Sequence, residues 1–167
     1  STSRMFVVSD KSAPEPIKQG GGNESADKAV EIQLEQPVFG TVSIGMADFY
    51  KFAAKKGQRI LVQCHADRLD SQMDATLEIL DEEGNELAVS KDQIGRDPLA
   101  DFVAPADGEY LIKVYDFIYK SSAKYFYHLT ATTKPHIDGI FPLAAQPGTK
   151  QKFTIFGRNL PGGSLGG

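Results

Sequence analysis

Apolar side chains recur at every second residue in six segments of the chain, and this spacing constrains the fold more than any other feature. The segments are 30–34, 48–54, 58–66, 75–80, 108–116 and 125–133. Successive side chains of a strand point to opposite faces of a sheet, so this period predicts strands with one buried face. Turn signals separate the segments, and no helical period intervenes. The sequence therefore predicts an all-β fold, an antiparallel, jelly-roll-like β-sandwich.

The segments on either side differ in composition from this central part, 30–133. Residues 1–29 contain two prolines and the triplet Gly20–Gly22, which predicts a linker. The short apolar run at residues 4–8 is a candidate for the last strand of a preceding module. Residues 134–167 predict two strands of a second β module. Two strands cannot bury a core of their own, so the chain is expected to stop inside that module.

Charge and composition exclude several classes of partner. The 167 residues include 22 acidic and 18 basic side chains, and the net charge of −4 is typical of a protein that binds no nucleic acid. No apolar run reaches the ~20 residues that span a bilayer, so no membrane insertion is expected. The single cysteine, Cys64, shares a strand face with Ile60 and Val62, which predicts a buried thiol.

Residues 106–116 contain three carboxylates beside two tyrosines, and an acidic catalytic strip must be weighed against a turn followed by a strand. Asp107 and Gly108 form a typical turn pair, and Glu109 then begins the strand. Asp107 and Glu109 are therefore interpreted as solvated turn residues. The three histidines, His65, His128 and His136, occur singly, and the first two are expected at the surface. No nucleophile motif accompanies them, so no catalytic residue is predicted.

Calcium is the one metal that the sequence suggests. Asp92, Asp97 and Asp101 lie in one predicted loop, and Asp116 ends the following strand. Calcium binds several oxygen ligands on flexible loops, although this spacing is not that of an EF-hand. The alternative is a solvated loop in which Arg96 neutralises one carboxylate.

Aromatic residues gather in the predicted hairpin of residues 115–127. Alternation turns Tyr115 and Phe126 outward, Tyr119 lies near the loop, and Lys113 shares the face of Tyr115. Exposed aromatics of this kind recognise ligands or proteins. These four residues are the predicted ligand-binding surface. The alternative is that a neighbouring module covers them.

Residues 30–133 resemble the bacterial pre-peptidase C-terminal (PPC) domain. The matching elements, in order, are "VFGTV", "DFYKFAA", "KKGQRILV", "ATLEILDEEGNELA", "APADGEYLIKVYD" and "YFYHLTAT". The resemblance implies a β-sandwich of a secreted or surface-displayed multidomain protein. Some relatives in collagen-degrading enzymes bind collagen and calcium, with calcium ligands largely in an acidic N-terminal linker. That region here offers Glu15, Glu24 and Asp27, which do not match those ligands residue by residue.

Residues 134–167 resemble the start of an IPT/TIG domain, which has an immunoglobulin-like fold. The resemblance rests on Pro135, Ile137, Ile140 and Pro142 and on a second group of residues, Gly148, Thr149, Phe153, Ile155, Gly157, Asn159 and Leu160. Neither family has a catalytic set of its own.

Two functions from different classes follow. The first is a non-catalytic accessory module of a large exported or cell-surface bacterial protein, extracellular or periplasmic, that binds a polysaccharide, a protein or a neighbouring domain of the same chain. The second is a processing or export-assisting segment attached to a secreted peptidase. A hydrolase with a site assembled from loops is a third, weaker hypothesis.

Overall fold

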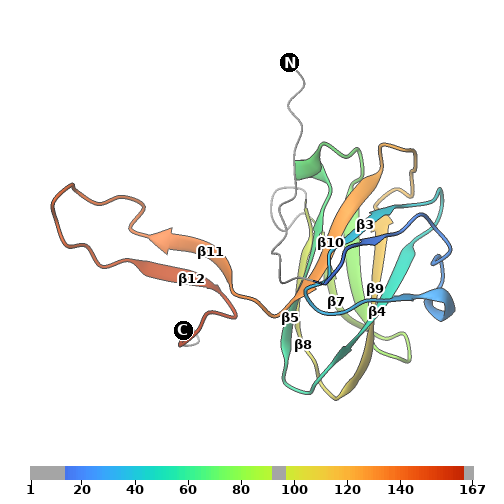
Figure 1. Ribbon diagram of the computed structural model, residues 1–167, viewed down its shortest axis with the longest axis horizontal. Helices are drawn as coiled ribbons and strands as arrows, with labels where there is room; N and C mark the ends of the chain where they lie inside the picture. The colour runs from blue at the N-terminus through green and yellow to red at the C-terminus, as the bar shows by residue number, and fades with distance from the viewer. Residues whose placement is uncertain (1–13, 92–96, 164–167) are drawn as a thin grey trace. The chain divides into compact units, whose positions relative to one another are not determined.

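Two five-stranded sheets form the first of two compact units in the computed structural model, which describes residues 14–91 and 97–163. The first unit ends at Thr132 and the second begins at Thr133. Sheet A has the order β1-β3-β10-β5-β8, and sheet B has the order β2-β4-β9-β6-β7 (Figure 1). The β-sandwich that the alternation predicts is confirmed.

The strands of sheet A are β1 (Ile17–Lys18), β3 (Val38–Thr41), β5 (Arg59–His65), β8 (Leu99–Val103) and β10 (Phe126–Thr132). Those of sheet B are β2 (Val30–Glu31), β4 (Asp48–Ala54), β6 (Ala75–Leu80), β7 (Glu86–Ser90) and β9 (Gly108–Asp116). Two short 3-10 helices, Ala26–Lys28 and Asp67–Leu69, lie between strands. The pairing is antiparallel except at one edge of each sheet, where β1 runs parallel to β3 and β2 runs parallel to β4.

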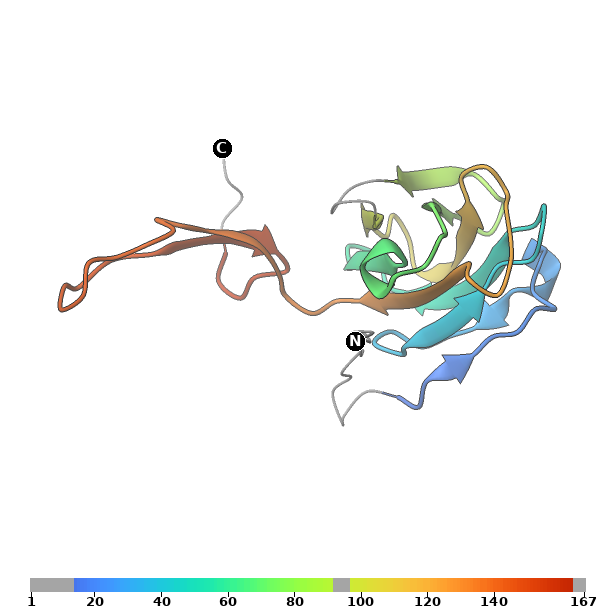
Figure 2. The same cartoon turned by 90° about the horizontal axis from the view of Figure 1, so that it is seen from above.

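The core lies between the sheets and includes the residues that alternation turned inward. In β9 these are Tyr110, Ile112 and Val114, each at most 3% exposed (Figure 2 shows the strands enclosing this interior). Sheet A contributes Ile60, Val62, Cys64 and, from β10, Tyr127, Leu129 and Ala131. The predicted burial of Cys64 is confirmed.

The predicted linker at residues 1–29 is wrong for the part that the structure describes. Ile17 and Lys18 pair with Val38 and Phe39 at the edge of sheet A. The side chain of Asn23 is fully buried and donates to the carbonyl of Phe49, 3.1 Å away. The glycines that suggested flexibility instead allow a turn, because Gly21 and Gly22 have φ of 108° and 92°.

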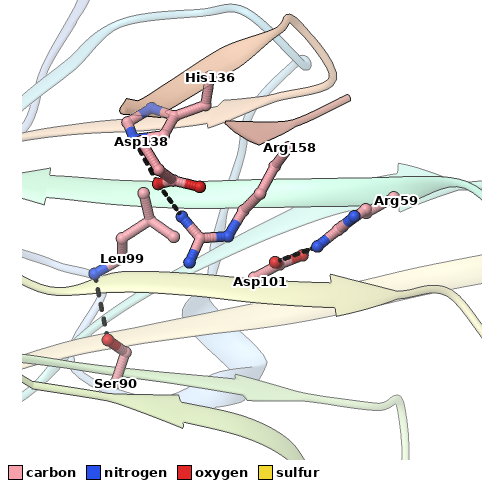
Figure 3. Close-up of polar contacts among 7 residues, drawn as sticks. All are labelled: Arg59, Ser90, Leu99, Asp101, His136, Asp138 and Arg158. Atoms are coloured by element: carbon pink, nitrogen blue, oxygen red, sulfur yellow. Dashed lines mark hydrogen bonds and ion pairs between the residues drawn. The ribbon is translucent and has the colours of Figure 1, made fainter. Parts of the chain in front are cut away.

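Residues 133–163 form a separate hairpin of β11 (His136–Phe141) and β12 (Thr154–Arg158). Arg158 pairs with Asp138 across it at 2.6 Å (Figure 3). Both strands leave large apolar side chains exposed, among them Ile137 at 61% and Phe141 at 66%. Among the described residues, no helix is long and apolar enough to cross a membrane.

Candidate functional site

A stacked pair of tyrosines lies where β9 ends on the outer face of sheet B. The rings of Tyr115 and Tyr119 are 5.1 Å apart between centroids and inclined by only 12°. The ammonium group of Lys113 lies 4.8 Å from the centroid of the Tyr115 ring. We call Lys113, Tyr115 and Tyr119 the tyrosine surface. Three of the four predicted binding residues therefore come together.

Glu78 on the neighbouring strand β6 fixes two members of this surface. One of its carboxylate oxygens accepts a 2.6 Å hydrogen bond from the Tyr115 hydroxyl, and the other accepts a 2.9 Å bond from Lys113. Burial, followed by this hydrogen bond to Glu78, raises the pKa of Tyr115. Tyr115 is therefore a neutral, half-buried support, whereas Tyr119 is 42% exposed and presents its ring to solvent. The alternation did not distinguish these two roles.

Phe126 does not belong to the tyrosine surface, so this part of the prediction is wrong. It begins β10, which pairs with β3 and β5 in sheet A, whereas Tyr115 is in sheet B. The segment between β9 and β10 crosses from one sheet to the other and is not the turn of a hairpin. Phe126 is half-buried, and its N–H donates to the hydroxyl of Ser71.

The carboxylates predicted to bind calcium do not converge. Asp101 lies on strand β8, not in a loop, and accepts two bonds of 2.8 and 2.6 Å from Arg59 (Figure 3). Asp97 is 2% exposed and accepts from the N–H groups of Ala66 and Asp67 and from the guanidinium of Arg68. These carboxylates therefore stabilise the sandwich through partners of their own. Asp92 lies outside the described residues.

Asp116 belongs to sheet B and has a structural role. One carboxylate oxygen accepts hydrogen bonds from the N–H groups of Ile118 and Lys120, at 3.2 and 2.9 Å. The other accepts a hydrogen bond from the backbone N–H of Asp74, at 2.9 Å. The side chain is 1% exposed, so these bonds replace the water that a buried carboxylate loses. Within residues 14–91 and 97–163, no group of three or more His, Cys, Asp or Glu side chains could hold a metal ion.

The N-terminal carboxylates that the family resemblance brought into question do not fit calcium either. Glu24 accepts a 3.0 Å hydrogen bond from the N–H of Gly22 within its own loop. The side-chain oxygen of Asn23 accepts from Gln19 at 3.0 Å. Among the described residues of this region, no group of three or more His, Cys, Asp or Glu side chains could hold a metal ion.

A buried hydrogen-bonded network connects the two sheets of the sandwich near the Asp116 end of β9. Tyr127 of β10 donates to Asp48 of β4 at 2.5 Å, and the hydroxyls of Tyr127 and Tyr50 are 2.5 Å apart. The second carboxylate oxygen of Asp48 is buried without a hydrogen-bond partner. Burial raises the pKa of Asp48 to about 6. The hydrogen bond from Tyr127 lowers this pKa, and the charge of Glu24 raises it further. Sequence reasoning missed this network, because alternation marks Asp48 only as an inward polar residue.

The prediction that His128 is a surface residue is wrong. It is 7% exposed and packs its ring 4.9 Å from Phe39 and 5.7 Å from His65, between centroids. Burial, and to a lesser degree the charge of His65, lowers the pKa of His128 to about 4. The pair is therefore a packed structural contact on the outer side of sheet A.

Comparisons with known proteins identify a family model and solved structures that are similar to this chain. Residues 47–116 match the family model of the bacterial pre-peptidase C-terminal domain. The crystal structure of that domain from the collagenase of Bacillus anthracis is similar with a TM-score of 0.51 and 22% identity, covering 62% of this chain and 93% of that one. The Aeromonas hydrophila protein PliG, a periplasmic inhibitor of g-type lysozyme, is similar with a TM-score of 0.46 and 16% identity, covering 70% and 98%.

One curated relative is a much larger protein than this chain. The chain is 35% identical over 68 residues to a "probable subtilase-type serine protease" of Deinococcus radiodurans. The matched region covers 40% of this chain and 9% of that protein. The chain thus spans about a tenth of the length of this relative. PPC domains are non-catalytic and occur in secreted proteins. The match to the family model of the PPC domain runs from residue 47 to residue 116 of this chain.

Proposed function

We propose that this chain is a non-catalytic accessory module of an exported bacterial protein and that the tyrosine surface binds an extracellular polymer or protein. The observation that carries the proposal is the Tyr115–Tyr119 stack, which holds an exposed aromatic ring in a fixed orientation. A tyrosine that is ordered before binding loses little conformational freedom on contact. Few such anchors are needed for a specific interface.

The chemistry of the surface favours a ligand with a flat apolar face and hydrogen-bonding groups. Tyr119 supplies the ring, and its hydroxyl can donate or accept. Lys113 is paired with Glu78 at 2.9 Å, so it adds little free positive charge. Sugar rings of a polysaccharide and proline-rich or collagen-like peptides both meet these conditions. A strongly anionic polymer does not.

Residues 134–167 are proposed to belong to a second, immunoglobulin-like module of the IPT/TIG kind. The support is the exposure of apolar side chains on both strands of the β11–β12 hairpin, including Ile140 at 43% and Phe156 at 55%. A two-stranded hairpin is at best marginally stable alone, so further strands or a neighbouring domain are expected to cover it.

The test is retention of the full chain on insoluble polysaccharides and on immobilised collagen. The Tyr119→Ala variant should lose at least tenfold in affinity while its melting temperature stays nearly unchanged, since the ring is exposed. Phe126→Ala is the matched aromatic control on the other sheet and should retain wild-type affinity. Affinity that depends on Phe126 and not on Tyr119 would place the site on sheet A and contradict the proposal.

A processing or export role is the second candidate, and the similarity to a subtilase-type protease is the observation that favours it. In this case, deleting the segment from the parent protein would reduce the secreted yield of mature protein. Substitution of Tyr119 alone would leave that yield unchanged. A yield that is insensitive to the deletion would exclude this role.

A further inference from the structure

Two loops at the Asp116 end of β9 expose apolar side chains at positions that usually carry polar residues. The first loop connects β3 to β4. Its N–H at Met46 donates to the carbonyl of Ser43 at 3.1 Å, which places Ile44 and Gly45 at the centre of a β-turn. Gly45 has φ of 70°, as a type II turn requires at its third position. The turn therefore projects Ile44 into solvent, where it is 76% exposed.

The second loop follows β9 and also exposes apolar side chains at the centre of a turn. The N–H of Tyr119 donates to the carbonyl of Asp116 at 2.8 Å, so Phe117 and Ile118 occupy the centre of the turn. They are 50% and 59% exposed. Tyr119 then adopts φ of 57°, an uncommon value for a residue with a side chain.

Hydrogen bonds join the two loops into one surface. The N–H of Gly45 donates to the carbonyl of Tyr119 at 3.1 Å, and the hydroxyl of Ser121 donates to the carbonyl of Val42. The large apolar side chains exposed on the joined loops form the surface that we call the apolar end: Ile44, Met46, Phe117, Ile118 and Tyr119.

Asp116 holds the second loop in place from below. Its buried carboxylate accepts hydrogen bonds from the N–H groups of Ile118 and Lys120 in the loop, and from the backbone N–H of Asp74 outside it. Ordering of this kind lowers the entropy that a binding loop loses on contact. The exposed apolar side chains thus project from a backbone that is already fixed.

The charges around the apolar end are of both signs, and the first loop has a carboxylate beside it, because Glu24 lies within hydrogen-bonding reach of Ser43. The ammonium of Lys91 lies 4.4 Å from the centroid of the Phe117 ring. Lys120 follows Tyr119 directly and is exposed. Asp74 is also exposed and lies beside Phe117, because the backbone carbonyl of Asp74 accepts a hydrogen bond from the N–H of Phe117. Charge complementarity therefore favours a ligand that places carboxylates over Lys91 and Lys120.

We propose that the apolar end docks a protein segment of apolar side chains flanked by acidic ones. This inference rests on the proposed function and names the partner of the same end of the molecule. Aromatic residues and methionine are enriched at protein interfaces, and the apolar end combines two aromatic rings with Met46. The aliphatic Ile44 and Ile118 favour a peptide over a sugar, since they offer no hydrogen bond and no flat ring.

A lipid bilayer is the other apolar partner, and the charges favour it less. Lysine side chains are attracted to an anionic bilayer, and the carboxylate of Asp74 would oppose that attraction. A peptide can place its charges to suit both signs, whereas an anionic bilayer cannot.

The test is selection of a phage-displayed random peptide library on the full chain, followed by affinity measurements of the selected peptides against variants. The double variant Phe117→Ser with Ile118→Ser removes the centre of the apolar end. Val103→Ser is the matched control, because Val103 is 56% exposed on β8 of the other sheet. Melting temperatures of all variants establish that they are folded, and Ile44→Ser on the first loop provides a second, independent change.

The proposal expects apolar peptides with acidic residues, weakened at least tenfold by the double variant and by Ile44→Ser, and unchanged by Val103→Ser. Failure to enrich any such peptide would overturn it. Binding of phosphatidylcholine–phosphatidylserine vesicles that depends on Ile118 would also overturn it, in favour of a bilayer. Ligands that depend on Tyr119 but not on Phe117, Ile118 or Ile44 would overturn this inference and leave the proposed function standing. Ligands that depend on none of these residues would contradict both.

Discussion

The two ends of β9 differ in whether they bury carboxylates. At the Gly108 end, which we call the acidic end, they face solvent in two turns and include Asp81, Glu82, Glu83, Asp107 and Glu109. Hydrogen bonds lower the pKa of Asp81, and the largest contribution comes from the side chain of Asn85. At the other end, the carboxylates of Asp48 and Asp116 are each 1% exposed, and apolar side chains face solvent instead.

This difference separates a solvated surface from the surface that we propose to bind a partner. The turn carboxylates of the acidic end lie at the surface, where Asp81 accepts hydrogen bonds from Asn85 and Asp107 accepts one from the N–H of Lys56. The apolar end buries two carboxylates and exposes five large apolar side chains, which costs stability unless a partner covers them.

The largest expected effect concerns the glycine beneath the apolar end. A Cβ on Gly40 would lie 2.3 Å from the ring of Tyr127, which is 1% exposed and bonded to Asp48. Gly40→Ala should therefore lower the free energy of unfolding by about 3 kcal/mol or more, since the ring has no space to move. Chemical denaturation followed by circular dichroism measures the change.

Gly108→Ala is the matched variant at the acidic end, where the nearest atom to the new Cβ is a flexible oxygen of Glu82 at 3.4 Å. Its effect should stay within about 1 kcal/mol. Equal losses at the two ends would show that the network beneath the apolar end is no more tightly packed than a surface turn.

Removal of a turn carboxylate should also distinguish the ends. Asp116→Ala leaves three backbone N–H groups without their acceptor and should lower the free energy of unfolding by about 2–4 kcal/mol. Asp107→Ala removes one exposed bond, from the N–H of Lys56, and should cost less than about 1 kcal/mol. The same denaturation experiment compares the two variants. If Asp116→Ala lowered the free energy of unfolding as little as Asp107→Ala, the second loop would not depend on the buried carboxylate of Asp116.

A third difference is pH dependence. Burial raises the pKa of Asp48 from 3.8 to about 6, so the folded protein keeps this proton to a higher pH than the unfolded chain does. The contribution of the protonated group is complete below about pH 4 and is lost as the pH rises through 6. The free energy of unfolding of the wild type, relative to Asp48→Asn, should therefore fall by roughly 2–3 kcal/mol between pH 4 and pH 7.

The comparison with Asp48→Asn cancels the opposite effect of His128, whose pKa is lowered to about 4 and whose contribution is lost as the pH falls. Asp107→Asn provides the control at the acidic end. A constant difference between the wild type and Asp48→Asn across this range would contradict the assigned pKa of Asp48.

Alternation predicted the sandwich and its core because the period of two follows directly from strand geometry. Tyr110, Ile112 and Val114 lie inward as predicted, and Glu109 is exposed. Alternation could not assign strands to sheets. It placed Phe126 beside Tyr115 because neighbours in sequence usually pair, whereas β9 and β10 lie in different sheets.

The candidate site was predicted only in part because its geometry depends on turns and partners. The roles of Lys113 and Tyr115 depend on Glu78, 35 and 37 residues away in sequence. The aspartate spacing suggested a shared metal, but a carboxylate can equally be satisfied by backbone N–H groups, as Asp97 is. Composition alone does not separate these outcomes.

The most direct test of the binding role is to locate the contact on the intact chain. Amide ¹H–¹⁵N correlation spectra of the full chain would be recorded during titration with the peptide of highest affinity from the library. Shifts confined to residues 43–47 and 115–121 are predicted, with the acidic end unchanged. Shifts concentrated at residues 81–86 and 105–109, with none at the two apolar loops, would contradict the account.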